Sequence, residues 1–201
     1  MTRPVCPTCK FLDAECICAF VKPVDNQTNI IVLQHKSEQQ HAKNTVRLAK
    51  LMYNNINVIV GDSAADFEII DSLPLSTTAL LFPSDNAENL DSAKVSKLTH
   101  LIILDGTWKK ASKLLFMLPT LQSFRKVSFS RIPKNQYRLR KANREDSLSS
   151  LEAIAYAIQC IENKSMAPAY TLLNAMMENQ FKRMPDHVRA RYLEKSGSKS
   201  N

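Results

Sequence analysis

Short runs of large apolar residues recur along the chain and alternate with segments of helical periodicity. The apolar runs occupy positions 29–33, 58–60, 79–82, 101–104 and 126–129, and each run predicts a short strand. Apolar residues recur every three or four positions over 44–54, 108–118, 149–162 and 171–182, which predicts helices there. Strands that alternate with helices are typical of a mostly parallel sheet with flanking helices. The sequence therefore predicts an α/β fold.

Composition divides the chain into three parts. Residues 1–24 hold four of the five cysteines, 25–190 carry the alternating pattern, and 191–201 are polar and small, which predicts a disordered tail. Cys160 lies in an apolar helical stretch and is interpreted as a small core residue. No apolar run approaches the ~20 residues of a membrane span, and the N-terminus lacks the apolar core of a signal peptide. We therefore expect a cytoplasmic protein with no membrane partner.

The four N-terminal cysteines form two close pairs, Cys6 with Cys9 and Cys16 with Cys18. In a reducing compartment, clustered cysteines are more often metal ligands than disulfides. Four thiolates can hold Zn²⁺ in a closed tetrahedral structural site. The sequence thus predicts a small zinc-binding element at the N-terminus. Free thiols and a redox-active Cys-x-x-Cys pair are the alternative interpretations.

The segment Asp105-Gly106-Thr107-Trp108 directly follows the predicted strand at 101–104. Gly106 permits a sharp turn, and Thr107 can cap a helix that begins at Trp108. In open α/β sheets, ligands gather at this strand-to-helix edge. A carboxylate, a hydroxyl and the only tryptophan of the chain are presented there together. An ordinary capped turn with a packed indole is the alternative interpretation.

Two other segments offer polar groups at the same predicted edge. Pro83 and Ser84 follow a predicted strand, and Ser147-Leu148-Ser149-Ser150 opens a predicted helix. Free backbone N–H groups at a helix start can bind a carboxylate or another anion. Glu152 in the first turn is either a second candidate catalytic carboxylate or an acid that complements the helix dipole.

Glycine is scarce, with three residues in a chain of 201. Neither a GxGxxG dinucleotide motif nor a P-loop can be built from isolated glycines. A Rossmann-type dehydrogenase or methyltransferase is therefore disfavoured. Any nucleotide-like cofactor would bind without a glycine-rich phosphate loop.

Net charge and its distribution indicate a polyanionic partner. The formal charge is +8, and eight Lys and Arg residues fall within 125–144 without an acid. Phe124, Phe129 and Tyr137 accompany them, and cations mixed with aromatics that stack on bases suit RNA better than a lipid surface. Pro133 disfavours an amphipathic membrane helix, and a solvated loop without a ligand is the alternative. The expected RNA contacts are Lys109, Lys110, Arg131, Lys134, Tyr137, Arg138, Arg140 and Lys141.

Taken together, these motifs resemble the DTW-domain family of tRNA-uridine aminocarboxypropyltransferases. Asp105-Gly106-Thr107-Trp108 matches the D-x-T-W signature of that family. Further motifs follow in family order from about Cys6 to Glu162: the cysteine pairs, His35 with Glu38, Asn44-Thr45, Leu81-Phe82-Pro83-Ser84, Tyr137-Arg138-Leu139-Arg140-Lys141 and Ser149-Ser150-Leu151-Glu152-Ala153. Lys36 stands where the family commonly has proline. Ser150 stands where it commonly has threonine, a change that keeps the hydroxyl.

The resemblance implies an S-adenosylmethionine-dependent enzyme that transfers a 3-amino-3-carboxypropyl group to N3 of a tRNA uridine. It also implies a SPOUT-like fold with a knotted cofactor site, which agrees with the missing glycine-rich loop. Asp105 is the expected general base, with Glu152 as the alternative. The expected cofactor contacts are Leu81, Pro83, Ser84, Asp105, Thr107, Trp108, Ser147, Leu148, Ser149 and Ser150. An RNA methyltransferase of the same fold and a non-catalytic zinc-containing RNA-binding module are the alternatives.

Overall fold

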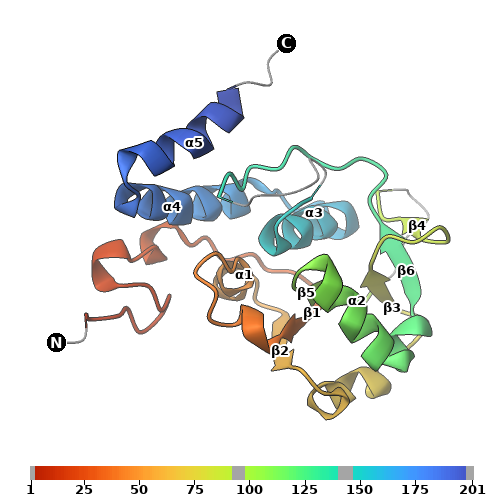
Figure 1. Cartoon of the computed structure of the whole chain (residues 1–201). Helices are drawn as coiled ribbons and strands as arrows, with labels where there is room; N and C mark the ends of the chain where they lie inside the picture. The colour runs from red at the N-terminus through yellow and green to blue at the C-terminus, as the bar shows by residue number, and fades with distance from the viewer. Residues whose placement is uncertain (1–2, 92–97, 140–146, 198–201) are drawn as a thin grey trace.

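One parallel sheet forms the centre of the molecule (Figure 1). The computed structural model describes residues 3–91, 98–139 and 147–197. Its strands are β1 (Asn29–His35), β2 (Ile56–Gly61), β3 (Thr78–Leu81), β4 (Glu88–Asn89), β5 (His100–Asp105) and β6 (Arg125–Ser128). They pair in the order β2-β1-β5-β3-β6-β4, and all of these pairs are parallel. The prediction of an α/β fold with a parallel sheet is confirmed.

Helices cover both faces of the sheet. On one face, Ile30 and Val32 of β1 share a core with α1 (Val46–Met52), α3 (Ser150–Glu162) and α4 (Ala167–Arg183). On the other face, Ile31 and Leu33 share a second core with α2 (Trp108–Met117), η4 (Ala64–Ser72) and η5 (Pro119–Gln122). Successive strand residues point to opposite faces, so a continuous apolar run is needed where both faces are buried.

The cysteine-rich N-terminal segment packs against the helical layer of the first face. It contains two short 3₁₀ helices, η1 (Asp13–Glu15) and η2 (Cys18–Phe20). Arg183 of α4 forms an ion pair with Glu15, and Asn179 donates to the Glu15 carbonyl at 2.8 Å. The guanidinium of Arg47 on α1 lies 3.8 Å from the centre of the Phe11 ring. The segment is therefore held by both α1 and α4.

Several elements differ from the sequence prediction. The helix α4 begins at Ala167 rather than Thr171, because Pro168 is tolerated in the first turn of a helix. The short edge strand β4 and the 3₁₀ helix η4 were not predicted. None of the helices formed by the described residues is long and apolar enough to cross a bilayer.

The C-terminal segment also differs from its prediction. Residues 191–197 of the expected disordered tail continue a last helix, α5 (Asp186–Gly197), which projects beyond α4 in Figure 1. The helix has Asp186 in its first turn, where an acid complements the helix dipole. It contains no glycine before Gly197, and Ala, Arg, Leu, Glu and Lys favour the helical backbone. Residues 198–201 lie outside the described part of the chain.

Candidate functional site

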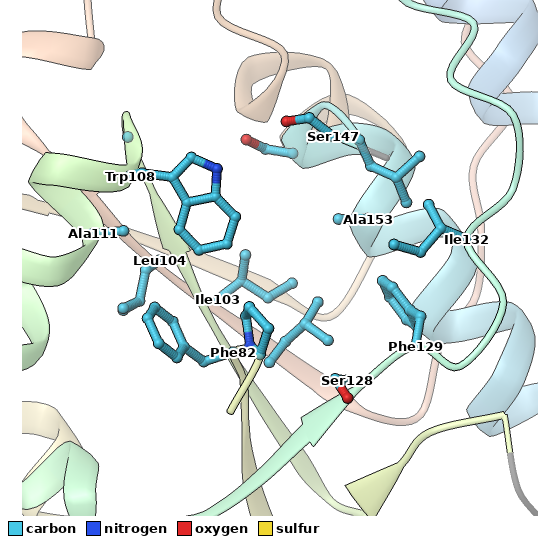
Figure 2. Close-up of a pocket in the computed structure, with 15 residues that line it drawn as sticks. Phe82, Ile103, Leu104, Trp108, Ala111, Ser128, Phe129, Ile132, Ser147 and Ala153 are labelled. Atoms are coloured by element: carbon cyan, nitrogen blue, oxygen red, sulfur yellow. The ribbon is translucent and has the colours of Figure 1, made fainter. Parts of the chain in front are cut away.

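A cavity of about 280 Å³ lies at the carboxyl edge of the sheet, where β3, β5 and β6 end. Its size is close to the lower end of the range of about 300–1,000 Å³ that is usual for small-molecule sites. Figure 2 shows Trp108 of α2 on one wall, Ser147 and Ala153 on the other, and Ile103 between them. The lining is mostly apolar, and Ser128, Ser147 and Ser150 supply hydroxyls. This arrangement suits an amphipathic small molecule.

The cavity brings together most of the predicted cofactor contacts. Leu81, Pro83, Trp108, Ser147, Leu148 and Ser150 line it, whereas Ser84, Asp105, Thr107 and Ser149 do not. The lining residues that the sequence reasoning missed are Phe82, Ile103, Leu104, Gly106, Ala111, Ser128, Phe129, Ile132 and Ala153. Several of these residues lie in or directly after a predicted strand. Because ligands bind at the carboxyl ends of parallel strands, these residues could have been predicted from the positions of the strands.

Trp108 lies at the mouth of the cavity with its side chain partly open to solvent. The residue is 53% exposed, and its ring meets Phe82 edge to face at a centroid distance of 6.1 Å. Thr107 caps α2 by accepting a hydrogen bond from the Lys110 backbone N–H at 3.4 Å. The capping part of the alternative interpretation is confirmed, but a packed indole is wrong. Burying so large and exposed an aromatic surface against a ligand would be favourable.

The Asp105 carboxylate lies beside the cavity and is almost fully buried. It is the last residue of β5 and pairs in register with Gln34 of β1. Gln34 Nε2 donates to Asp105 Oδ2 at 2.8 Å, and the Ser150 hydroxyl donates to Asp105 Oδ1. The carboxylate thus joins the ends of two strands to the start of α3. These two donors fix the orientation of the carboxylate.

Glu152 lies in the first turn of α3 and has no exposed surface. Its Oε2 accepts hydrogen bonds from the Ser149 N–H at 2.8 Å and the Ser149 hydroxyl at 2.7 Å. Its Oε1 accepts one from the Gln136 N–H at 2.6 Å, and the residue does not line the cavity. This capping box supports the interpretation of Glu152 as a helix-terminus acid. The geometry does not favour it as the base.

The aromatic residues of the basic segment face inward. Tyr137 is buried, and its hydroxyl donates to the Lys43 carbonyl at 3.0 Å. Phe124 is buried in the core below α2, and Phe129 lines the cavity with its ring 4.8 Å from that of Tyr156. The expectation that Tyr137 stacks on RNA bases is therefore not supported. The apolar area of these rings is used in the protein interior instead.

The predicted cationic RNA contacts are found in different environments. Lys109, Arg131 and Lys134 are exposed. Lys110 forms an ion pair of 2.5 Å with Glu38, and Arg138 lies over the Phe181 ring and 3.8 Å from Glu178. The three exposed cations are therefore more accessible to a polyanionic partner than the two paired ones. Arg140 and Lys141 lie outside the described residues.

The four N-terminal cysteines converge as predicted. Their sulfur atoms all lie within 4.8 Å of one another, with 3.5 Å between Cys6 and Cys16 and 3.8 Å between Cys9 and Cys16. Four sulfurs bound tetrahedrally to zinc at about 2.3 Å would be about 3.8 Å apart, so the cluster fits this metal. The backbone N–H groups of Cys9 and Thr8 lower the pKa of the Cys6 thiol to about 6, which favours the thiolate form that binds metal.

The described residues form an α/β protein with an all-parallel sheet, a mostly apolar cavity at a strand-to-helix edge and a cluster of four cysteines that could hold a metal ion. Residues 3–188 match the family model described as the DTW domain, so the chain belongs to the DTW-domain family.

The chain is also similar in sequence to several curated proteins that share one name. The chain is 27% identical over 173 residues to tRNA-uridine aminocarboxypropyltransferase 2 of Macaca fascicularis, covering 81% of this chain and 58% of the relative. It is 25% identical to the mouse (Mus musculus) protein of that name, covering 88% and 65%, and 25% identical to the Drosophila melanogaster protein, covering 88% and 76%. The chain thus spans less than two thirds of the length of the first two relatives. No solved structure matches the chain significantly.

Proposed function

We propose that this protein transfers the 3-amino-3-carboxypropyl group of S-adenosylmethionine to N3 of a uridine in tRNA, with methylthioadenosine as the other product. The names of the relatives support this reaction. The observation that carries the proposal is the position of the family turn: Gly106 and Trp108 line one ligand-sized cavity opposite the Ser147–Ser150 segment, and Asp105 lies beside it, bonded to Ser150. A SPOUT-like, knotted cofactor site and a cytoplasmic location are part of the same proposal.

The lining of the cavity fits S-adenosylmethionine, which has an aromatic base at one end and an amino acid at the other. Leu81, Pro83 and Trp108, with Phe82, offer an apolar surface for the adenosine. The hydroxyl of Ser147 offers a hydrogen-bond donor for the methionine carboxylate. In this arrangement the reacting carbon chain lies towards the serine side of the cavity.

Asp105 is the proposed general base. Uridine N3 carries a weakly acidic proton that must leave as the nitrogen attacks carbon, and a positioned base can contribute about 10²–10⁴-fold. Asp105 is held beside the cavity by Gln34 and Ser150, whereas Glu152 is buried away from it. The choice between methyl and aminocarboxypropyl transfer depends on which carbon attached to sulfur faces the nucleophile.

Exposed cations give the protein a surface that suits tRNA. Lys109 lies on α2 next to Trp108, and Arg131 and Lys134 lie beyond β6 next to the cavity residues Phe129 and Ile132. Cations on both sides of a cavity can neutralise phosphates on either side of a bound nucleotide. Cys6, Cys9, Cys16 and Cys18 would hold a structural zinc ion, which would cross-link the N-terminal segment.

Mass spectrometry of nucleosides tests the proposed reaction. Bulk unmodified tRNA is incubated with the purified protein and S-adenosylmethionine, then digested and analysed. A uridine heavier by one aminocarboxypropyl group, together with methylthioadenosine, is the expected result. A gain of one methyl group would replace the proposal with an RNA methyltransferase. Bound tRNA with no modified nucleoside would support a non-catalytic zinc-containing RNA-binding module.

A further inference from the structure

Ser150 is the polar group that connects the cavity to Asp105. Ser150 lines the cavity, whereas Asp105 does not. The Ser150 hydroxyl donates its proton to Asp105 Oδ1. A hydroxyl has one proton to donate and two lone pairs that accept. With its proton directed at the carboxylate, Ser150 Oγ can accept a hydrogen bond from a group inside the cavity.

We propose that Ser150 relays the N3 proton of uridine to Asp105 and that Gln34 positions Asp105 for this transfer. This inference rests on the proposed function, and it adds one catalytic residue and one positioning residue to it. As N3 attacks the carbon bound to sulfur, its proton passes to Ser150 Oγ while the Ser150 hydroxyl proton passes to Asp105 Oδ1. The carbon–sulfur electron pair stays on sulfur, and neutral methylthioadenosine leaves.

Rigid elements hold all three residues of this relay. Gln34 and Asp105 are register partners on β1 and β5, and Ser150 is the first residue of α3. Gln34 is buried, and its hydrogen bond of 2.8 Å occupies Asp105 Oδ2, so that Oδ1 is directed at Ser150. Catalytic groups placed on strands and helices are held more accurately than groups placed on loops.

A matched pair of variants separates a relay from a simple cofactor contact. Ser150→Thr keeps the hydroxyl. Ser150→Val introduces a side chain of nearly the same shape as threonine but without a hydroxyl. A relay predicts that Ser150→Val lowers kcat on the order of 10²-fold, while Ser150→Thr keeps kcat within a few-fold of the wild-type value. A cofactor contact predicts instead a higher KM and dissociation constant for S-adenosylmethionine with little change in kcat. Ser123→Ala, at an exposed serine beyond η5, is the control.

A double variant tests whether Ser150 and Asp105 act as one unit. When two residues act together in one step, the effects of mutating them are not additive. The double variant Asp105→Asn with Ser150→Val is therefore expected to be no slower than the slower single variant. Losses that multiply would show independent roles and would overturn the relay.

Gln34→Leu tests the positioning role. The readout is the pH dependence of kcat, which loss of a purely structural residue would not shift. The buried carboxylate loses a donor to its ionised form, so the pH at half-maximal kcat is expected to rise. A uniform loss of kcat with an unchanged pH midpoint would remove Gln34 from the proposal.

Wild-type kcat in Ser150→Val would overturn the relay and leave the proposed function intact. Absence of product with the wild-type protein would overturn the proposed function itself.

Discussion

Glu152 and Gln136 are joined by a hydrogen bond of 2.6 Å between the Glu152 carboxylate and the Gln136 backbone N–H. The same carboxylate accepts two hydrogen bonds from Ser149, the N-cap of α3. Glu152 therefore connects the segment around Gln136 to the first turn of α3. This relationship gives a carboxylate in a family motif a structural role, and it separates that role from the chemistry assigned to Asp105.

Glu152→Gln is expected to lower stability more than it lowers catalysis. A carboxamide turns an NH₂ group towards donors that need an acceptor, and leaving buried donors unsatisfied costs about 1–3 kcal/mol. For a chain of this size, the melting temperature should fall by roughly 2–12 °C. Glu88→Gln, at an exposed glutamate 3.9 Å from Arg125, is the control. An unchanged melting temperature with kcat lost would return the base role to Glu152.

Asp105→Asn is expected to reduce turnover by about 10²–10⁴-fold, the usual contribution of a general base. The amide keeps the shape of the side chain, so cofactor and tRNA binding should stay close to wild type. Single-turnover kinetics at saturating S-adenosylmethionine measure the chemical step directly, and calorimetry measures binding. Near-normal single-turnover rates would remove the base role from Asp105.

Local patterns in the sequence predicted much of the fold and part of the site. The cysteine cluster was predicted because its ligands lie within thirteen positions of one another (6 to 18). Strand ends could be read from apolar runs, and the all-parallel order brings those ends to one edge. Leu81 and Trp108 line the cavity for this reason.

What the sequence did not predict depends on contacts between distant residues. The hydrogen bond from Gln34 to Asp105 joins residues 71 positions apart and depends on the register of β1 and β5. Tyr137 was misinterpreted because a basic neighbourhood says nothing of where a ring is buried, and its hydroxyl bonds to Lys43, 94 positions away. Charge along a chain indicates a partner, but packing decides which side chains meet it.

Trp108 makes the cavity observable by fluorescence, because it is the only tryptophan of the chain. Its ring is 53% exposed, so a ligand that covers it should shift the emission to shorter wavelength. Titration with S-adenosylmethionine or its product methylthioadenosine measures the change and gives a dissociation constant. Trp108→Phe should abolish the signal and weaken binding only modestly. Calorimetric binding without any change in emission would place the ligand away from Trp108.

Exposed cations near the cavity should set the salt dependence of tRNA binding. If Lys109, Arg131 and Lys134 each neutralise a phosphate, an alanine at any one of them should reduce the slope of log K against log salt by about 1. Lys50→Ala, at an exposed lysine on α1 that does not line the cavity, is the control. If all four variants had the same slope of log K against log salt, the RNA-binding surface would have to lie elsewhere.

Metal analysis tests the cysteine cluster and its attachment to α4. The wild-type protein is expected to contain one zinc ion per chain, and Cys16→Ser should lose most of it because a closed site needs all four ligands. Cys160→Ser removes a cysteine outside the cluster and should keep the metal.

Loss of zinc should also destabilise α4, because Glu15 accepts a hydrogen bond from Asn179 and forms an ion pair with Arg183. Hydrogen exchange is expected to accelerate in the last turns of α4 after treatment with a chelator, and the melting temperature should fall. A metal-free protein with unchanged exchange in α4 would contradict a structural zinc ion. Reversible disulfide formation within the cluster would favour a redox-active pair instead.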